Sequence, residues 1–191
     1  MGGAESLDAQ SAQRGGVVII PAFAVGRAQT VLYYIQQLKS RHAIPDVPVY
    51  LNSPMAVDAT QLYHTHLDAH RLTRAQFHAM CTVAQPVNTP DDSRRLNRRM
   101  ETGGRVLHHI KQCAPDARNT LLFAGFQAGG TRGAAIVGGA DSVKIHGEYV
   151  PVRAEVAQLD ALSSHADYAE TIVWLRNFRA PPRDTFLVHG E

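Results

Sequence analysis

Cysteine, lysine and long apolar runs are scarce in this sequence of 191 residues. The two cysteines, Cys81 and Cys113, are far apart and match no zinc or redox spacing, so we expect buried thiols in a reducing compartment. No apolar run approaches the roughly 18 residues that a membrane-spanning helix needs. The polar segment from Met1 to Arg14 also lacks the apolar centre of a signal peptide. These absences predict a cytoplasmic protein without a membrane partner.

Net charge is also small, at +2, so bulk charge does not indicate a nucleic-acid partner. The choice of cation is more informative, because lysine occurs only at Lys39, Lys111 and Lys144 and every other basic residue is arginine. Arginine presents a planar fork that binds phosphate through two donors, whereas lysine is a point charge. A GC-rich genome produces the same bias, and both explanations stay open.

The apolar residues, 45% of the chain, alternate between strand and helix spacing. The β-branched run Val17–Ile20 is typical of a buried parallel strand, and Arg27–Ser40 has the spacing of an amphipathic helix. A strand at 47–51 then turns through residues 52–54 into a helix from about Ala56. The later pattern predicts a helix from residue 105, strands at 119–123, 154–159 and 185–188, a glycine-rich stretch at 125–139, a hairpin of 143–145 with 150–152, and a helix at 168–178. This order predicts an α/β fold with parallel-sheet βαβ layers.

At four places a short strand or a glycine turn leads directly into a predicted helix. The clearest three junctions are Gly26-Arg27, Ser53-Pro54 and Gly103-Gly104-Arg105. Free backbone N–H groups at a helix N-terminus bind anions, although turn geometry alone explains any single glycine. Because all three junctions have arginine or serine nearby, they together indicate a phosphate-lined groove. The candidate phosphate contacts are Arg27, Ser53, Gly103, Gly104 and Arg105.

The segment 63–70 nearly spells the zinc-binding pattern H-x-H-x-D-H, with Ala69 as an extra residue. It lies in a predicted helix, where His64 and His66 would be roughly 200° apart and unable to share one metal ion, although His66 and His70 could do so. The true pattern needs a loop, where alternate residues converge. We therefore interpret these histidines as solvated side chains of a helix.

Two other histidines follow predicted strands, His165 in the run Leu162–Asp167 and His189 in Leu187–Glu191. The carboxyl end of a strand in an open α/β sheet is a common place for ligand-binding residues. A single histidine is more often structural, but two in such settings, the first close to Ser164 and Asp167, form a candidate site.

Five blocks of the sequence together resemble one family. They are GVVIIPAFAVGRAQ at 16–29, NSPMA at 52–56, TGGRVLHH at 102–109, GFQA at 125–128, and the stretch from residue 152 through SSHAD at 163–167 to HGE at 189–191. In combination they resemble the β-CASP branch of the metallo-β-lactamase fold, which includes ribonuclease J and the endonuclease that cleaves pre-messenger RNA 3′ ends. The resemblance implies a β-CASP domain at about 15–148. It also implies, at 149–191, the returning C-terminal part of a metallo-β-lactamase αββα fold.

For function, the resemblance implies two zinc ions beneath a β-CASP cap, with RNA, or single-stranded DNA, in the cleft between. Paired zinc ions generate hydroxide near neutral pH and stabilise charge on a phosphate. His165 would be the catalytic residue that contacts the scissile phosphate and helps to protonate the leaving oxygen. His189 would be a zinc ligand, and Asp167 and Ser164 would help to orient an imidazole.

The sequence departs from the family in two places. The remaining zinc ligands, within the N-terminal part of the metallo-β-lactamase domain, would lie before Met1, so we expect this chain alone to be inactive. About ten residues that form a strand would also be missing between Arg99 and Met100, which leaves neighbouring strands unpaired. Either another segment fills this gap, or the chain is poorly stable and associates through the exposed edge as a homodimer. The chain would then be a truncated, split or degenerate member.

The sequence thus predicts part of a zinc-dependent RNA phosphodiester hydrolase. One alternative is a non-catalytic nucleic-acid-binding or partner module that has lost the metal site. Another is a metallo-hydrolase that acts on a small substrate other than nucleic acid. Zinc content separates the first two, and digestion of labelled RNA against DNA tests the third.

Overall fold

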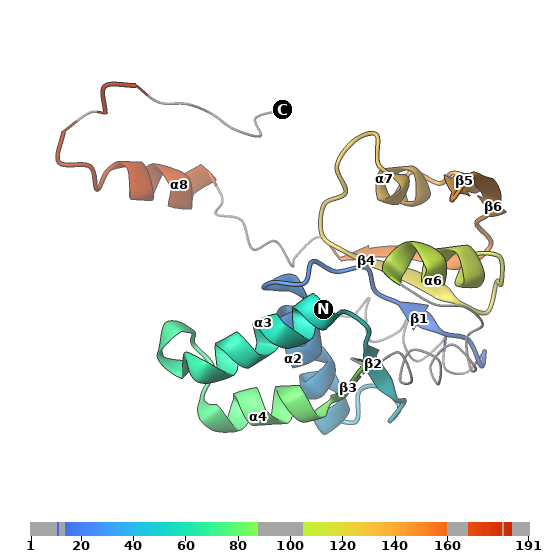
Figure 1. Ribbon diagram of the computed structural model, residues 1–191, viewed down its shortest axis with the longest axis horizontal. Helices are drawn as coiled ribbons and strands as arrows, with labels where there is room; N and C mark the ends of the chain where they lie inside the picture. Colours follow the sequence, from blue (N-terminus) through green and yellow to red (C-terminus); the bar gives the residue numbers. More distant parts are fainter. Residues whose placement is uncertain (1–10, 12–13, 88–104, 160–167, 181, 185–191) are drawn as a thin grey trace.

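A computed structural model describes residue 11 and residues 14–87, 105–159, 168–180 and 182–184 (Figure 1). Several sequence predictions lie outside these residues. They are the arginine cluster at 94–99, Gly103, Gly104, the junction between Arg99 and Met100, Ser164, His165, Asp167, His189 and the strand at 185–188.

The central sheet has three parallel strands in the order β1–β4–β7. They are β1 (Val18–Ile19), β4 (Thr120–Ala124) and β7 (Glu155–Leu159). All five residues of β4 are buried, as expected for a middle strand covered on both faces. The strands predicted at 17–20, 119–123 and 154–159 are therefore confirmed, each shifted or shortened by one or two residues at its ends.

One face of this sheet is covered by α6 (Arg105–Cys113), α7 (Arg132–Val137) and the antiparallel hairpin of β5 (Ser142–Ile145) and β6 (Glu148–Pro151), as Figure 1 shows. The strand β5 alternates exposed and buried residues, which is the pattern of a sheet with one solvated face. Ile110, Leu121, Phe123, Ile136 and Ile145 form the centre of this core. The pattern predicted no helix in the glycine-rich stretch 125–139, and α7 corrects it, because the Thr131 side chain caps the helix there.

A second layer pairs β2 (Val49–Leu51) in parallel with β3 (Ala84–Pro86). It also holds α2 (Arg27–Ser40), α3 (Pro54–Thr65), the 3₁₀ turn η1 (Leu67–Ala69) and α4 (Arg74–Thr82). The helix α2 has the predicted bounds, and Leu32, Phe77 and Met80 are the fully buried residues of this core. The sequence reading missed α4 and β3, although Thr73 and Gln76 form a capping box that marks the start of α4.

No strand among the described residues joins the β1–β4–β7 sheet to the β2–β3 sheet. The last described helix, α8 (Tyr168–Leu175), lies apart from both sheets in Figure 1 and has no buried residue. None of the described helices is both long enough and apolar enough to span a bilayer.

The predicted boundary between residues 148 and 149 falls inside β6, and β7 on its C-terminal side pairs with β4. The proposed division of the chain into 15–148 and 149–191 stays a prediction.

Candidate nucleic-acid interface

Arg27 is the first residue of α2, and its side chain is buried, with 7% of the residue exposed. Its Nη1 donates a hydrogen bond to the carbonyl oxygen of Ala124, the last residue of β4. Within the described part of the chain, the Arg27 guanidinium has no carboxylate partner and its buried Nε has no hydrogen-bond partner. A buried cation without a counter-charge is costly. This position therefore favours a bound anion.

The N-terminus of α3 lies beside that of α2. Gln29, in the first turn of α2, donates through Nε2 to the carbonyl oxygen of Ala56 (3.3 Å), in the first turn of α3, and to Oγ1 of Thr60 (3.0 Å), in its second turn. Ser53 caps α3, because its Oγ accepts a hydrogen bond from the Ala56 backbone N–H at 3.2 Å. The positive ends of two helix dipoles are thus brought together. Several of their first N–H groups already have partners: those of Arg27 and Ala28 donate to carbonyl oxygens, and that of Ala56 donates to Ser53.

His109 ties α6 to the same place. Its Nε2 lies 2.8 Å from Nδ2 of Asn52, the residue before the Ser53 cap. Burial lowers the pKa of His109, and the neighbouring His108 lowers it further, so the ring is neutral near pH 7. A neutral ring that accepts from Asn52 at Nε2 carries its proton on Nδ1. That Nδ1 is buried and has no hydrogen-bond partner among the described residues.

We call this convergence of Arg27, Asn52, Ser53, His109 and Ala124 the strand-end site, because it lies where β2 and β4 end and where α2 and α3 begin. The backbone of Arg105 opens α6, which His109 docks against the Asn52 turn. The site gathers helix N-termini and a buried cation, and such groups bind phosphate.

The segment that carries the predicted catalytic histidine starts next to this site. Leu159, the last residue of β7, is the register partner of Ala124. The chain therefore leaves the sheet toward residues 160–167 beside the strand end that Arg27 contacts. Gly103, Gly104, Ser164, His165, Asp167 and His189 lie outside the described residues, and their roles stay predictions.

The described residues contain no group of three or more histidine, cysteine, aspartate or glutamate side chains that could hold a metal ion. A zinc site would therefore require residues beyond them, such as His189. No zinc-dependent step follows from the described geometry.

Sequence reasoning missed three polar residues of this region: Gln29, Asn52 and His109. Asn52 and His109 are 57 positions apart, so their contact exists only in the folded chain. Each of them lies in a block that resembles the β-CASP family, and this was the available signal.

The segment 63–70 is not one helix, because α3 ends at Thr65 and His66 follows it as the C-cap. His64 and His66 are exposed, as expected. His70 is half-buried and stacks on Phe77, with ring centroids 5.4 Å apart, and its Nε2 lies 3.1 Å from the carbonyl oxygen of Tyr63. His70 is therefore a packing residue, which corrects the prediction that it is solvated.

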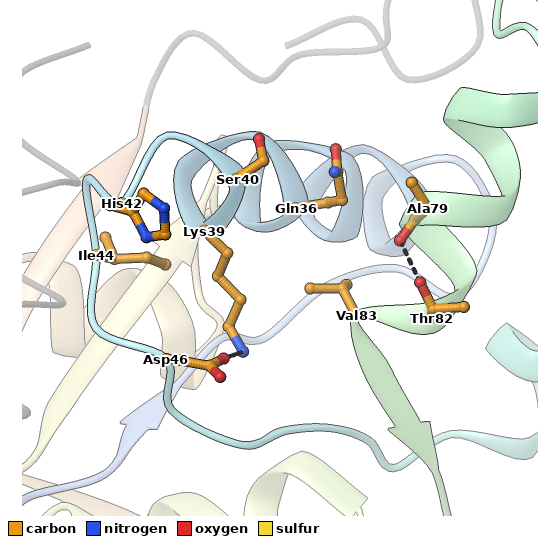
Figure 2. Close-up of a pocket in the computed structure, with 9 residues that line it drawn as sticks. All are labelled: Gln36, Lys39, Ser40, His42, Ile44, Asp46, Ala79, Thr82 and Val83. Atoms are coloured by element: carbon orange, nitrogen blue, oxygen red, sulfur yellow. Dashed lines mark hydrogen bonds and ion pairs between the residues drawn. The ribbon is translucent and has the colours of Figure 1, made fainter.

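A pocket of about 440 Å³ lies elsewhere, between the C-terminal ends of α2 and α4 (Figure 2). Its one lysine, Lys39, donates to Oδ1 of Asp46 (2.8 Å) and to the carbonyl oxygen of Val47 (2.6 Å). The ion pair lowers the pKa of Asp46 and satisfies the cation. Arg27 is at the opposite end of α2, so this pocket is separate from the strand-end site.

Two protein-family models match the chain. The model of the Beta-Casp domain matches residues 28–136, and that of the Zn-dependent metallo-hydrolase RNA specificity domain matches residues 149–191.

Curated relatives agree with these matches. Ribonuclease TTHA0252 of Thermus thermophilus is 38% identical over 93% of this chain and 44% of its own length. Transcription termination factor FttA of Methanosarcina mazei is 31% identical over 94% of this chain and 32% of its own length. The RNase J-like protein of Methanocaldococcus jannaschii is 27% identical over 95% of this chain and 45% of its own length. The chain therefore spans less than half the length of each of these relatives.

Proposed function

Because this chain belongs to the Beta-Casp family of RNA hydrolases, we propose that it is part of a zinc-dependent ribonuclease and that the strand-end site holds the RNA backbone. The observation that carries this proposal is the convergence of the α2 and α3 N-termini around a buried guanidinium that lacks a carboxylate partner in the described residues. Both the positive ends of the helix dipoles and the cation favour phosphate oxygens.

In this proposal Arg27 supplies positive charge, and Ser53 presents a hydroxyl at the positive end of the α3 dipole. Gly103, Gly104 and Arg105 would extend the phosphate path at the start of α6. His165 would contact the scissile phosphate, with Asp167 and Ser164 near it, and His189 would bind zinc. The chain enters the His165 segment from Leu159, whose partner in the sheet is Ala124, and this proximity supports the arrangement.

Zinc dependence agrees with the family model that matches residues 149–191. Two ions would need several ligands besides His189, because a zinc site takes three or four protein ligands. The rest would come from a metallo-β-lactamase part outside this chain.

A non-catalytic RNA-binding module is the second candidate, because the described residues bring together anion-binding groups but no metal-binding group. One pair of measurements separates the two: zinc content after dialysis, and cleavage of a labelled single-stranded RNA.

We expect this chain alone to retain little zinc and to leave the RNA intact, because His189 is the only one of the expected zinc ligands that it contains. It should nevertheless bind the RNA, and its affinity should fall as salt rises because phosphate contacts release counterions. Tightly held stoichiometric zinc with robust cleavage would contradict the expectation for the isolated chain. Absence of salt-dependent RNA binding would contradict the proposed site.

In the enzyme completed with the metal-binding part, the two histidines should differ in effect. His165→Ala should reduce turnover roughly a hundredfold to ten-thousandfold, as loss of a general acid does, and leave zinc bound. His189→Ala should also reduce zinc content. Equal zinc loss in both variants would show that the two roles are wrongly assigned.

A further inference from the structure

Large apolar side chains are exposed around the strand-end site. Phe23 is 77% exposed, Val25 62%, Met55 67% and Phe126 73%. Phe23 and Val25 lie between β1 and α2, Met55 lies in the first turn of α3, and Phe126 follows β4. The exposed groups thus occupy segments that follow three different parallel strands. A single exposed apolar residue is ordinary, but a group of them indicates a binding surface.

Both phenylalanines belong to backbone segments that contact Arg27 or its helix. The carbonyl oxygen of Phe23 accepts a hydrogen bond from the Ala28 backbone N–H at 3.0 Å, which fixes Phe23 at the start of α2. Phe126 follows Gly125, whose missing side chain leaves the space that the Arg27 guanidinium fills. The Gln127 Nε2 donates to the carbonyl oxygens of Gly125 (3.2 Å) and Phe126 (3.1 Å), and so holds this turn.

The chain segments that carry these two rings contain basic residues but no acidic ones. Residues 17–45 and 117–140, which contain both phenylalanines, include no aspartate or glutamate. An exposed aromatic surface beside a buried cation and helix N-termini, without carboxylates in its own segments, is complementary to a ligand with flat apolar faces and negative charge. Single-stranded nucleic acid has both, whereas bases in a duplex are stacked on each other and present no free face.

We propose that Phe23 and Phe126 stack on nucleobases of single-stranded RNA whose phosphates occupy the strand-end site. This inference rests on the proposed function and adds base contacts to it, so that the site prefers an unpaired strand of any sequence. Stacking is tolerant of sequence because every base has a π-face.

The test compares two fluorescent oligonucleotides with equal numbers of phosphates, a single-stranded RNA and its abasic analogue, by anisotropy titration with the full 191-residue chain. The variants are Phe23→Ala and Phe126→Ala, with Phe126→Tyr to restore a ring. Tyr149→Ala is the matched control, because Tyr149 is an equally exposed aromatic residue, at 75%, on the β5–β6 hairpin. Because both phenylalanines are mostly exposed, their removal should leave the circular dichroism spectrum and thermal midpoint unchanged.

We expect each alanine variant to bind the RNA on the order of tenfold more weakly while its affinity for the abasic analogue stays at the wild-type value. Phe126→Tyr and Tyr149→Ala should bind both ligands like the wild type.

If wild-type protein binds the RNA and the abasic analogue equally well, base stacking is refuted while phosphate binding stands. Binding of neither ligand by wild-type protein would refute the proposed function as well. If the alanine variants keep wild-type RNA affinity and lose only self-association in size-exclusion chromatography, the rings contact protein instead, and the stacking proposal is wrong.

Discussion

At the carboxyl end of β4, Gly125 lacks a side chain at the place where the Arg27 guanidinium lies. Its φ of +98° is also a conformation that residues with a Cβ rarely adopt. We therefore expect Gly125→Ala to lower the free energy of unfolding by roughly 1–3 kcal/mol and to weaken RNA binding, since Arg27 must move.

Two nearby glycines are matched controls for that change. Gly130 has φ +75° but open space, so Gly130→Ala measures the backbone cost alone, and Gly129→Ala has neither obstacle. Urea denaturation of the three variants gives the comparison. Equal effects for Gly125→Ala and Gly130→Ala would mean that the Arg27 contact contributes nothing.

The lowered pKa of His109 leads to a prediction about how the stability of the fold depends on pH. Burial holds its pKa below the ordinary value, so the folded state resists the proton that the unfolded state accepts. The stability that comes from the neutral ring is present above the unfolded-state pKa of about 6.5 and is lost as pH falls toward the lower folded-state pKa. The Asn52 contact would be lost with it, because a protonated Nε2 cannot accept a hydrogen bond.

We expect His109→Gln to show a smaller loss of stability than wild-type protein between about pH 7.5 and about pH 5.5. Denaturant midpoints measured across this range test it. The control is His78→Gln, which removes an exposed histidine on α4 and should keep the wild-type slope. A wild-type slope in His109→Gln would show that His109 is not held neutral.

At the scale of elements, α3 and α4 start with similar hydroxyl caps, but only α3 starts at the strand-end site. The Ser53 side chain accepts from the Ala56 N–H, and the Thr73 side chain accepts from the Gln76 N–H at 3.3 Å. Ser53→Ala and Thr73→Ala should each cost about 1 kcal/mol of stability, as lost caps do. Only Ser53→Ala should also weaken RNA binding, by a few-fold, in an anisotropy titration. Equal RNA affinity of the two variants would remove Ser53 from the site.

The elements that the sequence predicted well have strong local signals. Both ends of α2 could be predicted because its apolar residues recur at helical spacing between Gly26 and Ser40. The strand β4 could be predicted because it is a short apolar run. The short helix α7 was hidden among glycines, and its one buried residue, Ile136, is identified only by its packing in the core.

For the whole molecule, the described strands form two parallel sheets and one antiparallel hairpin, and no described strand connects the two parallel sheets. The predicted loss of a strand lies between Arg99 and Met100, outside the described residues. We expect insertion of a typical family strand at this junction to raise the thermal midpoint by several degrees and to favour the monomer, because a central strand pairs with neighbours on both sides and buries apolar helix surface. Differential scanning calorimetry and sedimentation test the insertion. A clean monomer without the insertion, with the same midpoint, would show that the sheets tolerate the missing strand and that the alignment needs to be redrawn.

The sequence by itself determined the α/β class, most strands and helices and, through five spaced blocks, the family. These features depend on short-range periodicity and on residues that stand close together in the chain. Only the tertiary structure decided that Arg27 is buried against Ala124 and that His109 contacts Asn52, because these partners are 97 and 57 positions apart. It likewise decided that His70 packs on Phe77. The helix α3 ends at Thr65, so His70 lies on the connection to α4, which carries Phe77, and not on a continuing helix. Burial and contacts between distant segments depend on how the layers pack, and a linear pattern does not contain that information.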